Sequence, residues 1–252
     1  MSGLEANLQD VQKRIAAAAE QCGRHPDDIT LVAVTKTQPP EVIQAAYDLG
    51  LRHFGENRVE EAETKVGHLP ADITWHMIGH IQSRKAKRVV PLFQSVHSVD
   101  RVKLARSLSR LCEDRPDALP ILLECNVSGE ASKYGFATEQ VADGGDLRKP
   151  LLAAVKEILG LPHLQVQGLM TMAPIVADPE DTRPVFRRLR RLRDKLAAAF
   201  PQANWHHLSM GMTDDFEVAI EEGATIIRVG RAIFAPELPA WRKGPSSQES
   251  EG

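Results

Sequence analysis

The sequence predicts a single (β/α)8 TIM barrel with an extra helix at its N-terminus. Eight short apolar runs, rich in β-branched residues, recur along the 252 residues, and amphipathic stretches lie between them. Most runs start 20 to 26 residues after the one before, which leaves room for one strand and one covering helix. Eight such units favour a closed barrel, and an open doubly wound sheet is the alternative.

Each expected element has a local reason in the sequence. The N-terminal helix is predicted because apolar residues recur at helical spacing over residues 4–15. Ser2 and Glu5 can form a capping box at its start, and Gly23 can end it. The strands are β-branched runs of the kind found in buried parallel sheets. In chain order they are expected at Ile29–Thr35, Leu51–Phe54, Ile73–Ile78, Ser95–Val99, Ile121–Val127, Gln165–Met170, Trp205–Ser209 and Thr225–Val229.

The covering helices are predicted from apolar residues that repeat on one face. Pro39-Pro40 opens one such helix, which closes at Gly50, and longer ones are expected over Val102–Cys112 and Val185–Phe200. The last of these carries five arginines between residues 187 and 193. They fit the solvated face of a barrel helix, and a surface for a partner or a nucleic acid is the alternative.

Composition and charge favour a cytoplasmic protein. The chain has 31 Lys+Arg and 34 Asp+Glu, a net charge of −3, which does not favour nucleic-acid or anionic-membrane binding. No apolar run is long enough to span a membrane, and the first residues do not form a secretory signal. The three cysteines are widely spaced and fit free thiols in a reducing compartment.

One domain accounts for most of the chain. We expect the barrel to occupy residues 1–242 and the polar residues 243–252 to form a disordered tail. The stretch ADGGDLRKP at 142–150 is predicted to be an exposed loop or a break in a helix.

Lys36 is the first candidate for chemistry, because residues that follow the strands of such a barrel face a common mouth. It comes directly after an apolar strand, so we expect it to lose hydration, which lowers the pKa of its amine. A neutral lysine amine can form a Schiff base with a carbonyl compound. The alternative is a solvated lysine paired with a surface carboxylate.

The ends of the seventh and eighth expected strands predict an anion site. Ser209 and Gly211 precede a helix expected to start at Thr213, so a hydroxyl and backbone N–H groups would lie beside a helix N-terminus. Gly230 allows close approach of the backbone, and Arg231 adds positive charge. Barrels of this type often bind phosphate at these two loops. The alternative is that both glycines are ordinary turn residues.

A Schiff-base lysine and a phosphate site at one mouth suggest pyridoxal 5′-phosphate, an aldehyde that carries a phosphate. Its pyridine nitrogen needs a protein partner, and Arg228 would project to the same side of its strand as Gly230. A protonated arginine leaves that nitrogen unprotonated, which makes the cofactor a poorer electron sink. An aldolase-like Schiff-base enzyme without cofactor is a further alternative, and it explains the paired glycines less well.

The chain resembles the pyridoxal phosphate homeostasis proteins (the YggS/PROSC group), which are related to the barrel domain of alanine racemases. The matching segments span roughly residues 30–235 and are VAVTK, HFGENRVEE, WHMIGHIQSRK, HSVD, CNVSGEASKYGF, GLMTMAP, LSMGMTDDFEVAIEEGATIIRVG and AIF. The resemblance implies a fold-type III pyridoxal-phosphate-binding barrel with the cofactor on Lys36. It also implies Arg228 at the pyridine nitrogen, Asn57 near the cofactor, and phosphate contacts from Ser209, Gly211, Gly230 and Arg231.

The sequence departs from the family pattern at a few positions. Arg84 stands where asparagine is usual, Glu124 where glutamine is common, and Ala235-Pro236 where a glycine follows the last phenylalanine. The 142–150 stretch resembles an insertion. None of these positions coincides with Lys36 or the phosphate residues, so they bear on the rim and on partner surfaces.

Two functions are consistent with a pyridoxal phosphate site on Lys36. In the first, the protein holds the cofactor with little or no turnover, and the apo forms of pyridoxal-phosphate-dependent enzymes are its partners. In the second, it is a racemase-like enzyme, which needs another acid/base opposite the lysine. The only tyrosines are Tyr47 and Tyr134, and only Tyr134 is expected near the mouth. With no second domain expected to supply that group, the carrier is favoured, as a monomer or weak dimer.

No metal site is expected. His76 and His80 are four residues apart, but the segment HMIGH lacks the glutamate of a zinc-binding H-E-x-x-H helix. His206 and His207 are adjacent on an expected strand, so their side chains would point to opposite faces.

Overall fold

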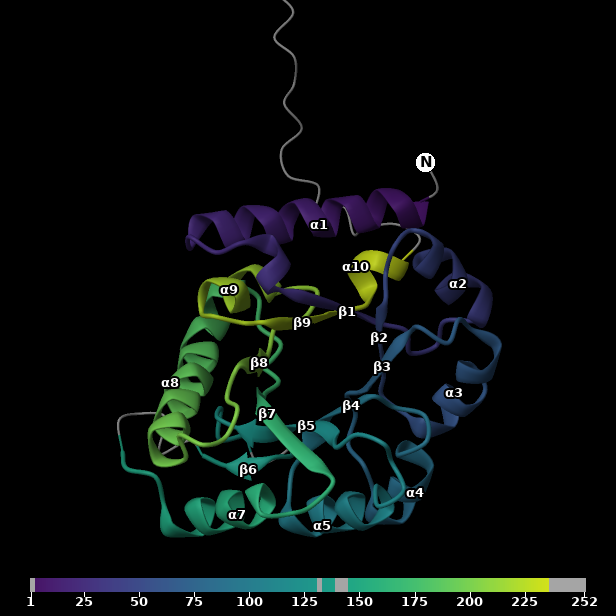
Figure 1. The fold of residues 1–252 in the computed structure, drawn as a ribbon. Coiled ribbons are helices and arrows are strands. Elements are labelled where there is room, and N and C mark those ends of the chain that lie inside the picture. The colour runs from purple at the N-terminus through teal and green to yellow at the C-terminus, as the bar shows by residue number, and fades with distance from the viewer. Residues whose placement is uncertain (1–2, 131–132, 139–144, 236–252) are drawn as a thin grey trace, which may run out of the picture.

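The computed structural model describes residues 3–130, 133–138 and 145–235, and it confirms the eight-stranded parallel barrel (Figure 1). The strands follow the order β4-β3-β2-β1-β9-β8-β7-β5, and β5 pairs back onto β4, so the sheet is closed rather than open. The barrel strands are β1 (Thr30–Val34), β2 (His53–Glu56), β3 (Thr74–Met77), β4 (Ser95–Val99), β5 (Leu119–Asn126), β7 (Leu164–Met170), β8 (His207–Ser209) and β9 (Ile226–Val229).

The eight expected strands are all present, with small shifts at their ends. No end moves by more than two residues, and in β2 both ends do: it runs from His53 to Glu56 rather than from Leu51 to Phe54. A short ninth strand was not expected: β6 (Phe136–Ala137) pairs with the end of β5 beside the barrel.

The helices surround the barrel, as the alternating pattern predicts (Figure 1). The N-terminal helix and the longer covering helices form where expected, and Gly23 and Gly50 follow two of them with positive φ. The helices are α1 (Gly3–Gln21), η1 (Pro26–Asp28), α2 (Pro40–Asp48), α3 (Val59–Glu63), η2 (Val66–His68), η3 (Ser83–Lys85), α4 (Ala86–Val89), α5 (Val102–Leu111), α7 (Lys149–Leu159), η4 (Pro179–Thr182), α8 (Arg183–Ala199), α9 (Phe216–Glu221) and α10 (Arg231–Phe234).

One helix start was predicted wrongly. We expected it at Thr213, but α9 begins at Phe216. The Asp215 carboxylate accepts a hydrogen bond from the Met212 N–H at 2.6 Å, which folds the intervening residues into a turn. Three other expectations lie wholly or partly outside the described residues: the Ser2 cap, the first part of the 142–150 stretch, and the tail from 243 on.

Helix α1 packs against α9 and α10. The Asn7 side chain donates hydrogen bonds to the backbone carbonyls of Ile233 and Ala235 at 3.1 and 2.9 Å, and Arg14 pairs with Glu217. These contacts fasten the start of the described chain to its end. None of the helices in the described ranges has the length and hydrophobicity to cross a membrane.

Apolar side chains form two separate layers. The larger lies between the strands and the helices and contains Phe54 and Phe186 among many others. The smaller lies inside the barrel and is made of Val32, Leu122, Met170 and Ile226. Since side chains alternate along a strand, residues two positions after these also face the interior.

The arginines of α8 are largely bound within the protein. Arg183, Arg187 and Arg190 all lie within 3.3 Å of the carboxylate of Glu222, which is 3% exposed. Burial alone would raise the pKa of Glu222, but the arginines lower it overall. These contacts favour a structural role for this part of the helix over a surface for nucleic acid.

Candidate functional site

Lys36 lies in the turn that follows β1, at the mouth of the barrel. Its side chain is exposed, so the expected loss of hydration is wrong for this structure. The strand end is buried, but the chain turns outward one residue later. The expected alternative, a surface ion pair, is not found either among the described residues, so the amine is accessible to a ligand.

A buried charged cluster holds the residue before Lys36. Lys65 lies 2.8 Å from the Glu56 carboxylate and donates to the carbonyl of Thr35 at 2.9 Å. The Thr35 hydroxyl donates to the same carboxylate at 2.6 Å. Burial raises the pKa of Glu56, and Lys65 and Thr35 lower it in part.

The residue after Lys36 is held as well. Thr37 has φ +64°, a left-handed conformation that is unusual for a β-branched residue. Its N–H donates to Glu61 at 2.9 Å, and Glu61 lies 3.6 Å from Lys65. Both neighbours of Lys36 are therefore fixed by one cluster, which sets where its backbone leaves the strand.

Gly230 brings the proposed phosphate loop beside the strand that carries Lys36. Strands β1 and β9 are neighbours with Ala33 opposite Val229, so Gly230 lies next to Val34. A Cβ on Gly230 would lie 3.1 Å from the Val34 carbonyl oxygen. This close approach places the start of α10 and the Lys36 turn side by side at the mouth.

Gly211 has φ +91°, and a Cβ there would lie 2.6 Å from that of Ala219, so a side chain is excluded. Arg231 forms an ion pair with Asp214, which joins the two loops that follow β8 and β9. Its guanidinium charge is thus shared with a carboxylate, while its side chain remains 72% exposed.

Arg228 lies inside the barrel and is 4% exposed. Its guanidinium donates to the Ser209 hydroxyl at 2.7 Å and to the Thr171 carbonyl at 2.9 Å. Burial lowers the pKa of Arg228 to about 10, so it is protonated at neutral pH. Ser209 is fully buried and is a direct partner of Arg228, a contact that spacing along the chain did not indicate.

Glu124 also faces the interior, two residues after Leu122. Burial, with a smaller contribution from Asp100, raises its pKa to about 7 against the opposing effect of Arg228. One of its oxygens, Oε2, is buried without a hydrogen-bond partner. In the sequence, Glu124 was noted only as a departure from a family pattern. Its position two residues after Leu122 could have predicted that both side chains lie on the same face of the strand.

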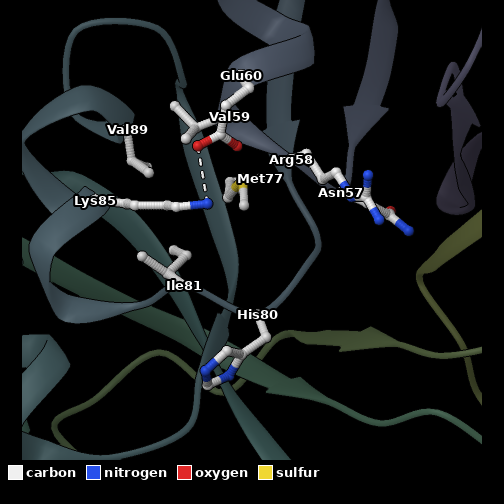
Figure 2. Close-up of a pocket in the computed structure, with 9 residues that line it drawn as sticks. All are labelled: Asn57, Arg58, Val59, Glu60, Met77, His80, Ile81, Lys85 and Val89. Carbon is white, nitrogen blue, oxygen red and sulfur yellow. Dashed lines mark ion pairs between the residues drawn. The ribbon is translucent and has the colours of Figure 1, made fainter.

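Asn57 lies at the end of β2 and is half-buried. It lines a hollow of about 40 Å3 between the barrel and helices α3 and α4, which also includes His80 and the ion pair of Lys85 with Glu60 (Figure 2). This hollow does not include Lys36 or Arg228 and is too small for a phosphorylated pyridine.

His80 and Tyr134 come together at the rim. Their rings stack with centroids 3.8 Å apart, and His80 Nδ1 lies 3.0 Å from Asp100, at ion-pair distance but without hydrogen-bond geometry. His76 instead faces the interior and contacts two other histidines, so His76 and His80 do not form a common site. No cluster suited to a metal ion occurs among residues 3–130, 133–138 and 145–235.

Comparison with known proteins agrees with this architecture. The family described as alanine racemase, N-terminal domain, matches residues 6–237. An alanine racemase from Clostridium difficile superposes with a TM-score of 0.70 over 94% of this chain and 57% of its own. At 13% identity, that likeness shows the fold alone.

Nearer relatives are similar along almost their whole length. The pyridoxal phosphate homeostasis protein of Aquifex aeolicus is 41% identical over 228 residues, 90% of this chain and 95% of that protein. The protein of the same name from Pseudomonas aeruginosa is 44% identical over 240 residues, with 93% and 96% covered. PipY of Synechococcus elongatus, solved with PLP bound, is 33% identical with a TM-score of 0.74, covering 89% of this chain and 99% of PipY. The chain therefore belongs to the pyridoxal phosphate homeostasis protein family.

Proposed function

We propose that this protein holds pyridoxal 5′-phosphate as a Schiff base on Lys36, with little or no catalytic turnover, and serves the homeostasis of that cofactor in the cytoplasm. The observation that carries the proposal is an accessible amine at the barrel mouth, beside the glycine-lined loop at Gly230. The names of the relatives and the bound PLP of PipY support it.

The residues at the mouth suit the parts of this cofactor. Gly211 packs closely on Ala219 and Gly230 on Val34, which brings the backbone of both loops to the edge of the mouth, and Arg231 adds a cation there. When bound, the cofactor supplies an aldehyde that condenses with an amine and a pyridine ring that withdraws electrons. Arg228 would lie at the pyridine nitrogen. Asn57 would contact the cofactor from the next strand end.

Ser209 is better suited to the ring end than to the phosphate. Its hydroxyl is fully buried, and its two partners, Arg228 and His97, lie inside the barrel. We therefore assign its effect on the cofactor to the positioning of Arg228. A phosphate contact, which the sequence suggested, would require the hydroxyl to turn away from both partners.

A racemase-like activity is the second candidate, and the stacked pair of Tyr134 and His80 is what favours it. Tyr134 is 54% exposed at the rim and could supply the second acid/base. Incubation of the loaded protein with L- and D-amino acids in deuterated water would show α-proton exchange by NMR. Exchange at ordinary enzyme rates, abolished in Tyr134→Phe, would establish the racemase and overturn the carrier.

The carrier proposal is tested by trapping the link to Lys36. Borohydride reduction of the protein mixed with pyridoxal phosphate is expected to leave a stable adduct on one peptide, the one that contains Lys36. Lys36→Ala should lose it, and Lys85→Ala, which removes a lysine outside the mouth, should keep it. Absence of an adduct in the natural protein, or its persistence in Lys36→Ala, would refute the proposal. Apo forms of pyridoxal-phosphate enzymes are the proposed recipients, and a monomer or weak dimer the proposed state.

A further inference from the structure

A continuous line of side chains crosses the barrel interior and ends at Arg228. His53 Nδ1 lies 3.0 Å from His76 Nε2, and His76 Nδ1 lies 3.0 Å from His97 Nε2. His97 Nδ1 lies 3.0 Å from the Ser209 hydroxyl oxygen, which accepts from Arg228 at 2.7 Å. Every ring nitrogen between the two ends is used.

The line spans the barrel both across and along its axis. Strands β4 and β8, which carry His97 and Ser209, are not neighbours in the sheet, so their contact crosses the interior. His53 is the first residue of β2 and Ser209 the last of β8. Because the strands are parallel, the line runs from the N-terminal end of the barrel toward the mouth.

The three imidazoles are neutral at pH 7. Burial lowers the pKa of His53 and of His97, and lowers that of His76 to about 3. A neutral imidazole has one N–H donor and one acceptor nitrogen. Each of the three contacts from His53 to Ser209 therefore needs one proton.

Only two arrangements supply one proton to each contact. In the first, the Ser209 hydroxyl donates to His97 Nδ1, and all three histidines carry their proton on Nε2. In the second, all three carry it on Nδ1, and Ser209 accepts from both His97 and Arg228. Any mixture of tautomers makes two donors or two lone pairs face each other at about 3 Å, which is costly in a buried site.

The first arrangement is favoured by the surroundings of Ser209. In the second, its hydroxyl proton would need a third partner, and no third partner of Ser209 is found in the described parts of the chain. In the first, the free Nε2–H belongs to His53, which is half-buried, so solvent can satisfy it.

We propose that His53, His76 and His97 form one hydrogen-bonded chain with a shared tautomer, which fixes the direction of the Ser209 hydroxyl and thereby positions the Arg228 guanidinium. The three histidines are positioning residues, because they act on the mouth only through Ser209 and Arg228. The effect on the cofactor rests on the proposed function, because Arg228 matters there as the partner of the pyridine nitrogen. The shared tautomer does not depend on it.

The shared tautomer is tested on the cofactor-free protein. Nitrogen NMR of histidine-labelled protein at pH 7 distinguishes the two neutral tautomers and the protonated ring. We expect His53, His76 and His97 all in the Nε2–H form, with His207, which contacts Thr225 instead, as an internal reference. A mixture of tautomers among the three, or a protonated ring, would overturn the proposal.

The positioning of Arg228 is tested with two substitutions at His97. His97→Phe removes the acceptor for Ser209, and His97→Asn restores a polar group near the position of Nδ1 while cutting the contact with His76. We expect His97→Phe to weaken pyridoxal phosphate binding about tenfold, the size of one lost buried hydrogen bond, and His97→Asn to recover most of it. The control His68→Phe replaces an exposed histidine of η2 outside the barrel interior and should bind as the natural protein does.

The outcomes separate the two proposals. Binding by a folded His97→Phe that equals the natural protein's would refute the positioning role. If His97→Phe does not fold, unchanged ring tautomers of His53 and His76 in His97→Asn would refute the coupling of the chain. If the natural protein fails to bind pyridoxal phosphate, the proposed function fails, and the tautomer measurement still decides whether the chain exists.

Discussion

Replacement of Glu124 by glutamine is expected to stabilise this protein at neutral and alkaline pH but not in acid. Glu124 is 3% exposed, and its Oε2 atom is buried without a partner. Burial, reinforced by Asp100 and opposed by Arg228, raises its pKa from 4.5 to about 7. Glutamine has nearly the same shape and never ionises, so it removes the cost of a buried negative charge.

The size and sign of the effect follow from proton linkage. Because the folded pKa is above the unfolded one, stability from this group is complete below pH 4.5 and is lost as the pH rises through about 7. The shift of roughly 2.5 pH units corresponds to about 3 kcal/mol at 1.36 kcal/mol per unit. Glu124→Gln should therefore gain up to about 3 kcal/mol over the natural protein at pH 8.

Urea unfolding of both proteins at pH 4.5 and pH 8 provides the assay. The difference in unfolding free energy should be small at pH 4.5 and near its full value at pH 8, with the slope against urea unchanged. A variant that is no more stable at pH 8, or that gains the same amount at both pH values, would refute the reasoning. The second outcome would point to packing rather than charge.

Three further substitutions have defined outcomes. Glu222→Gln removes the carboxylate shared by three arginines of α8 and should cost about 2 kcal/mol at pH 7 in urea unfolding, and less as acid protonates Glu222; an equal cost at all pH values would contradict this. Gly211→Ala should cost about 1–3 kcal/mol by strain, whereas Gly67→Ala, where a Cβ meets open space, should be nearly neutral; equal costs would refute the strain. Lys65→Met leaves the buried Glu56 unpaired and should cost about 3–5 kcal/mol, a value that a loss below 1 kcal/mol would exclude.

The barrel was predictable from sequence because its signals are local. Each strand is a β-branched run, and the spacing between runs leaves room for a crossover helix. Parallel strands can therefore be predicted without knowing the register between them. The mouth followed from the same reasoning, since a residue after a parallel strand must lie at one end of the barrel. This is why Lys36 and Gly230, on adjacent strands, were placed correctly at one edge.

The contacts inside the barrel were not predictable in the same way. His76 and His97 are 21 residues apart, and their contact depends on the tilt and stagger of β3 against β4. The partnership of His97 with Ser209 depends in addition on closure of the sheet. Hydration of Lys36 was mispredicted for a related reason, because the turn after β1 is set by the strained Thr37 and the cluster around Lys65.

The proposed carrier role is consistent with the groups that surround Arg228. In the proposed role, Arg228 faces the pyridine nitrogen, and with a pKa of about 10 it keeps its proton at neutral pH rather than transferring it to the ring. In the proposed chain, neutral histidines contact Arg228 through Ser209, so they fix its position and add no charge. Turnover would need an acid/base on the side opposite Lys36, and the rim offers Tyr134, exposed and stacked on His80. A catalytic role for this site would therefore depend on the rim, whereas Arg228 at the pyridine nitrogen would keep a bound ring electron-rich.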